Sequence, residues 1–85
     1  MNKFIEYDIH NGIILLRCAI MNILKSLDSM EIDSYTFGPN ISIHLVIQCM
    51  YENGWVENKG IWYTPSKRDF AFTDDVNLTL ELANN

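Results

Sequence analysis

The stretch ISIHLVIQCMYENGWVENKGIWYTP, residues 41–65, decides the fold class. Its first half, residues 41–53, carries apolar side chains at helical spacing and ends on Asn53-Gly54, a pair typical of a helix stop. Its second half has aromatic and β-branched residues on both sides of a short loop that contains Gly60, as a β-hairpin does. A helix that leads directly into a hairpin predicts an α+β fold.

Residues 41–53 also fit a strand, because apolar residues occupy every second position from Ile41 to Cys49. We favour the helix for three reasons. Asn40 in front can cap it, Gly54 behind can end it, and the segment is longer than most strands.

Upstream, residues 13–28 place apolar side chains on one helical stripe, which predicts the second main helix. Residues 3–9 alternate between apolar and polar types, which predicts an N-terminal strand that ends at Asn11-Gly12. Downstream, residues 76–82 alternate like a strand, but Thr73 and two acids precede them in the manner of a helix cap. We favour a short C-terminal helix there.

Residues 1–85 are therefore predicted to form one small α+β domain with an N-terminal strand, two main helices, a β-hairpin and a short C-terminal helix. The helix followed by a hairpin is also the order of elements in a winged helix. Because a chain of 85 residues encloses little space, a large substrate cavity is not expected.

The residues with reactive or metal-binding side chains do not form a recognisable site. His10, His44, Cys18 and Cys49 lack the close spacing of zinc ligands, and we interpret both cysteines as packing residues. No nucleophile with a neighbouring base and no phosphate-binding glycine loop is evident. We predict no enzymatic activity, no metal and no cofactor.

The start of the chain places Glu6 and Asp8 where a signal peptide needs an apolar core, so we expect a cytoplasmic protein. Residues 13–27 are apolar, but Arg17 and Lys25 interrupt them, so no membrane span is expected.

The chain has more apolar and aromatic residues than so small an interior needs: 48% are hydrophobic and 12% aromatic. This surplus predicts a homodimer or a protein partner. The apolar candidates for partner contact are Ile14, Leu15, Met21, Trp55, Trp62 and Tyr63. Three acids of one run, Asp28, Glu31 and Asp33, are further candidates in a chain with a net charge of −5. Solubility is the simpler explanation of these acids.

Residues 53–75 contain Asn53-Gly54-Trp55, then GIWYTP at 60–65, then Phe72 to Asp75. This stretch, about a third of the chain, resembles short uncharacterised phage and prophage proteins in which a helix leads into a hairpin and a last helix. The resemblance implies a mobile element and a role against host machinery. The prediction is a non-enzymatic inhibitor that blocks a host defence protein, such as a CRISPR or restriction component.

Two alternatives remain open. The first is a small dimeric transcription regulator that binds DNA through Lys59, Lys67 and Arg68, although residues 41–53, its reading helix, contain neither Lys nor Arg. Nucleic acid is therefore the less favoured partner. The second is an accessory subunit with a structural role.

Overall fold

The computed structural model describes the backbone of residues 3–83 and the side chains of residues 12–83. In chain order the elements are α1 (Lys3–Asp28), β1 (Ser34–Thr36), α2 (Ile43–Glu52), β2 (Val56–Asn58), β3 (Ile61–Tyr63), β4 (Asp69–Asp74) and β5 (Thr79–Leu82). The five strands form one antiparallel sheet in the order β1-β5-β4-β3-β2. The α+β fold class is confirmed.

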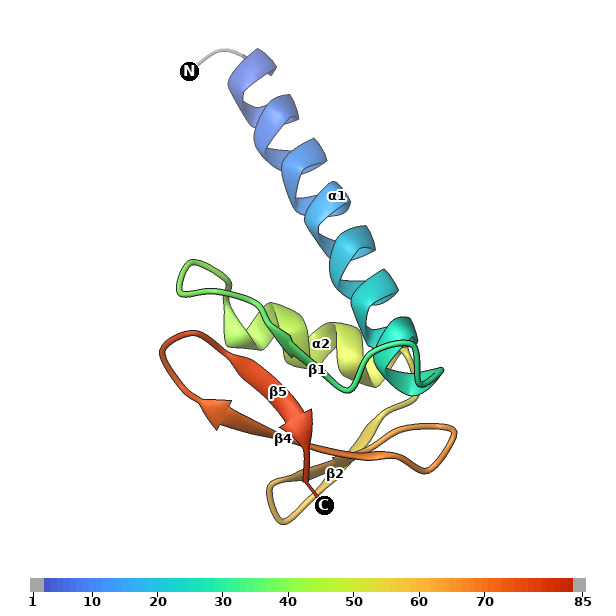
Figure 1. Ribbon diagram of the computed structural model, residues 1–85. Coiled ribbons are helices and arrows are strands. Elements are labelled where there is room, and N and C mark those ends of the chain that lie inside the picture. The colour runs from blue at the N-terminus through green and yellow to red at the C-terminus, as the bar shows by residue number, and fades with distance from the viewer. Residues whose placement is uncertain (1–2, 84–85) are drawn as a thin grey trace.

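The core lies between one face of this sheet and the two helices (Figure 1). Trp62 pairs with Phe70 and Phe72 pairs with Leu80 in the register, so strand alternation points all four toward the helices. Trp55 stacks on Phe70 with ring centroids 5.4 Å apart. The helices contribute Ile20, Leu24, Leu27, Val46, Cys49 and Met50 to the same cluster.

Helix α2 and the β2–β3 hairpin confirm the prediction from residues 41–65, with the helix two residues shorter at its start and one at its end. Ser42, in an extended conformation, is its N-cap rather than Asn40. At its end, Gly54 adopts φ +82°, and the Trp55 amide donates to the Met50 carbonyl at 3.0 Å. A left-handed glycine thus turns the chain from the helix into the sheet.

The predicted N-terminal strand at residues 3–9 is wrong, because α1 already begins at Lys3 and continues through Asn11-Gly12. A glycine inside a helix is only about 1 kcal/mol less favourable than alanine, so it does not force a break. The apolar residues Ile5, Ile9 and Ile13 lie four apart and continue the helical stripe of residues 13–28 toward the N-terminus. The helical spacing that continues from residues 13–28, and not the short alternation at residues 3–9, therefore predicts the observed structure.

The predicted C-terminal helix is also wrong. Strand β4 extends to Asp74, a turn follows, and β5 returns beside β4. The Asp74 carboxylate accepts hydrogen bonds from the amides of Val76 and Asn77, at 2.9 and 3.0 Å. These are the bonds that a capping acid would make, and here they close a turn instead. The alternation of residues 76–82 therefore reports a strand.

The winged-helix order of a helix followed by a hairpin is present, but the winged-helix architecture is not. Between α1 and α2 lie residues 29–42, which include β1, whereas a helix-turn-helix joins its helices by a short turn. The β2–β3 hairpin continues through β4 into the sheet and is not a free wing.

The N-terminal half of α1 extends beyond the rest of the domain (Figure 1). The 26 residues of α1 span about 39 Å and the 10 of α2 only about 15 Å. Ile20, Leu24 and Leu27 are buried, whereas Ile13, Ile14 and Leu15 are 49%, 44% and 70% exposed. We call residues 3–15 the projecting half of α1. No helix in the described part of the chain is both long and apolar enough to cross a membrane.

Candidate docking groove between the two helices

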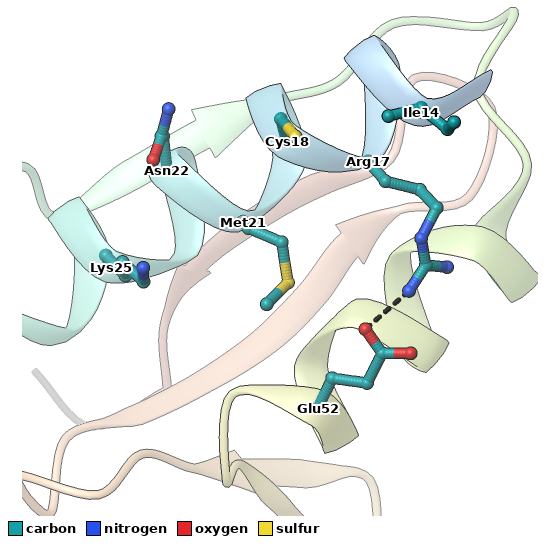
Figure 2. Close-up of a pocket in the computed structure, with 7 residues that line it drawn as sticks. All are labelled: Ile14, Arg17, Cys18, Met21, Asn22, Lys25 and Glu52. Atoms are coloured by element: carbon teal, nitrogen blue, oxygen red, sulfur yellow. Dashed lines mark hydrogen bonds and ion pairs between the residues drawn. The ribbon is translucent and has the colours of Figure 1, made fainter. Parts of the chain in front are cut away.

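A groove of about 300 Å³ lies between α1 and α2, next to the projecting half of α1 (Figure 2). Its lining residues are Ile14, Arg17, Cys18, Met21, Asn22 and Lys25 from α1 and Glu52 from α2. Ile14, Cys18 and Met21 lie four and three residues apart, so they share one face of α1. This face forms an apolar stripe with charged groups at its sides.

Arg17 crosses from α1 to α2. Its guanidinium forms an ion pair with Glu52 (Figure 2). It also donates a 3.3 Å hydrogen bond to the Gln48 side-chain oxygen. The hydrogen bond with Glu52 raises the pKa of Arg17 above its ordinary value, so the group stays charged. Close by, the Asn53 amide nitrogen lies 3.2 Å from the Met21 sulfur. These contacts join α1 to α2 beside the groove.

The two cysteines of the chain lie in different surroundings. Cys18 is an exposed thiol without a hydrogen-bond partner among the contacts of residues 12–83, and Cys49 lies in the core, where burial raises the pKa of its thiol. Among the described residues, no three His, Cys, Asp or Glu side chains cluster to hold a metal ion. The apolar stripe of the groove suits contact with an apolar side chain or helix.

The apolar residues predicted to contact a partner separate into two groups. Ile14 and Met21 line the groove, and Leu15 is exposed beside it. Trp55 and Trp62, however, are only 1% and 5% exposed, so their burial leaves no surface for a partner. Tyr63 is half-buried in β3, opposite Val56 on the sheet face that lies away from the core. Core packing explains the tryptophans.

The predicted acidic contact residues are engaged within the domain. Asp28 accepts hydrogen bonds from the Ser66 amide and hydroxyl, at 3.1 and 2.5 Å. Asp33 pairs with Arg68 at 2.6 Å, and Glu31 accepts a 3.2 Å bond from the Ser29 hydroxyl. Two of the three therefore connect the end of α1 and the following loop to the β3–β4 turn. A role in partner binding stays a prediction.

Asp28 gives a testable pH dependence. Burial alone would raise the pKa of its carboxyl, but hydrogen bonds from Ser66 and Thr64 outweigh burial and hold the pKa below the ordinary value of 3.8. The ionised Asp28 carboxylate therefore contributes fully to the stability of the fold above about pH 4, and this contribution is lost as the pH falls through the folded-state pKa. We expect the free energy of unfolding of Asp28→Asn, measured with urea, to depend less on pH below pH 4 than that of wild type. Equal slopes for Asp28→Asn and wild type would contradict the assignment.

The three cations of the DNA-binding alternative do not form a free basic patch. Lys59 and Lys67 are exposed turn residues with positive φ. Arg68 instead points inward: it donates to the Leu27 and Ile32 carbonyls and to Asp33, and its guanidinium lies 5.2 Å from the centre of the Phe70 ring. A phosphate would have to compete with all of these partners.

Sequence reasoning missed Arg17, Lys25 and Glu52 as parts of the groove. A charged residue inside an apolar helix, as Arg17 is, signals a partner on a neighbouring element, but the sequence does not identify Glu52 as that partner. Comparison of the chain with protein-family models, with curated proteins and with solved structures finds no match. The function must therefore be inferred from the geometry.

Proposed function

We propose that this chain is a non-enzymatic protein-binding module whose docking surface is the projecting half of α1 together with the adjacent groove. The observation that carries the proposal is the exposure of three consecutive large apolar residues, Ile13, Ile14 and Leu15, on a helix that extends past its own domain. Isolated helical segments of this length are marginal in water, so such a segment gains stability from a partner. Exposed apolar patches commonly mark interfaces.

The charge of α1 supports a protein partner over a nucleic acid. Helix α1 contains three basic and three acidic residues and is neutral, so the net charge of −5 lies entirely in residues 29–83. Binding to phosphates requires an excess of cations on the contact surface. A neutral apolar surface instead suits burial against another protein. That this partner is a host defence protein blocked by a phage inhibitor stays a prediction, based on the resemblance and the acidity.

Affinity capture from host lysate tests this surface. We expect wild type to retain a stoichiometric protein partner and Leu15→Asp to lose it, because a buried carboxylate without a partner opposes binding. Val76→Asp is the matched control, since Val76 is 72% exposed and lies in the β4–β5 turn. A partner retained equally by both variants would move the docking surface elsewhere, and the absence of any stoichiometric partner, self-association included, would reject the proposal.

A further inference from the structure

We infer that the occupant of the groove is the projecting half of α1 from a second copy of this chain, in a two-fold antiparallel dimer. The inference rests on the proposed function, since it names the partner of the same surface. Each copy would supply one projecting half and one groove, so both surfaces are covered at once. An interface of this kind is self-complementary, as closed dimers require.

The spacing of the stripe that lines the groove continues in the sequence toward the N-terminus of α1. Ile14, Cys18, Met21 and Lys25 follow the 4-3-4 spacing of a seam between packed helices. Toward the N-terminus the same spacing reaches sequence positions 11, 7 and 4, which are Asn, Tyr and Phe. By this spacing, one mostly apolar seam extends from the groove toward the tip of the helix. Two copies of α1 can therefore pair through the same seam.

Contact area favours insertion into the groove over pairing of the tips alone. If half of each helix cylinder is covered, projecting halves about 20 Å long bury roughly 600 Å² in total, below the roughly 1,200 Å² of a stable interface. When each tip reaches Asn22 in the groove, the helix contact lengthens to about 30 Å and roughly 900 Å². This area is larger than that of the tips alone but still below the threshold, so contact of each tip with α2 has to supply the rest.

Charge favours the antiparallel arrangement. Helix α1 is neutral, so two copies of it do not repel each other, whereas residues 29–83 of each copy carry all of the net charge of −5. An antiparallel pair places these two acidic bodies at opposite ends of the helices, and a parallel pair would place them together. The helix dipoles also oppose each other only in the antiparallel arrangement.

When position 3 of one copy lies opposite Asn22 of the other, position 7 lies opposite Cys18. A parallel pair would instead bring the two Cys18 residues together.

The first test is the mass of the full chain in solution by sedimentation equilibrium at several concentrations. We expect a dimer whose dissociation constant rises at least about tenfold in Ile14→Asp, because the substitution buries two carboxylates near the dimer axis. Val76→Asp, a matched change at an exposed apolar residue outside the groove, should leave the dissociation constant of the dimer unchanged. Circular dichroism of each variant shows that the fold persists. A monomer at all concentrations, or a dimer unaffected by Ile14→Asp, overturns the inference.

The second test fixes the orientation by mild oxidation and a non-reducing gel. Tyr7→Cys should form a cross-linked dimer with Cys18, because opposed positions in the seam lie within the roughly 7 Å between Cα atoms that a disulfide needs. Ile9→Cys, on the opposite side of the helix, should not, and buried Cys49 does not compete. Efficient cross-linking of wild type through Cys18 alone would overturn the antiparallel arrangement. If the chain is monomeric but Ile14→Asp abolishes capture of another protein, this inference fails and the proposed function stands.

Discussion

Trp55→Ala is expected to lower the free energy of unfolding by about 3–5 kcal/mol. Trp55 is fully buried, stacks on Phe70, and stands where the chain passes from α2 into the sheet. Its removal leaves a large cavity between helix and sheet that neighbouring side chains cannot fill. Because the free energy of unfolding of a small domain can be as low as about 5 kcal/mol, most of the Trp55→Ala protein should be unfolded at 37 °C.

Urea unfolding followed by far-ultraviolet circular dichroism measures this loss. The adjacent Val56→Ala is the control, since Val56 is exposed and its truncation should change the free energy of unfolding by less than about 0.5 kcal/mol. Trp55→Phe should retain part of the stability because it keeps a ring against Phe70. A Trp55→Ala variant as stable as Val56→Ala would show that the helix–sheet interface is not the core.

Arg68→Ala is expected to lower the free energy of unfolding by about 2–4 kcal/mol. The side chain is 11% exposed and donates to the Leu27 and Ile32 carbonyls and to Asp33. Its loss removes charge-assisted hydrogen bonds and the cation–π contact with Phe70 together. The end of α1, the following loop and β4 would lose the group that joins them.

Arg68→Lys separates charge from geometry. It keeps the positive charge but lacks the planar fork of donors, so we expect it to recover only a small part of the stability in the same urea experiment. Lys67→Ala, one residue away at an exposed turn, is the control and should behave like wild type. If Arg68→Ala is as stable as Lys67→Ala yet one of them loses DNA binding, the DNA-binding alternative would be favoured instead.

The central part of the fold could be predicted from local signals, and the two ends could not. Residues 41–65 combine a helical stripe, a glycine stop and a hairpin, and all three agree with the final packing. At residues 3–9 a short alternation competes with the helical spacing that continues from residues 13–28, and the helix forms. At residues 73–82 a helix cap competes with an alternation, and pairing in the sheet favours the strand. Strand β5 pairs with both β4 and β1, and no short-range pattern reports β1, which lies far away in the sequence.

The candidate site could be predicted only in part, because local patterns do not report contacts between distant elements. Surplus apolar residues on α1 follow from helical periodicity, and Ile14 and Met21 do line the groove. The frequency of aromatic residues in interfaces predicts a surface position for the tryptophans, but large rings also fill the core of a small domain, and both tryptophans are buried there. The ion pair between Arg17 and Glu52 joins two helices, so it depends on a crossing that periodicity does not give.

The position of β5 in the sheet has a consequence for the order of folding. Strands β2, β3 and β4 meet through short turns and can assemble as soon as they have been synthesised. Strand β1 must wait for β5, because residues 34–36 pair with residues 79–81. Closing that long loop carries the largest entropic penalty of any pairing in the sheet. During synthesis the nascent chain therefore exposes part of its apolar core until β5 has been synthesised. A chaperone would bind the chain most readily in this period.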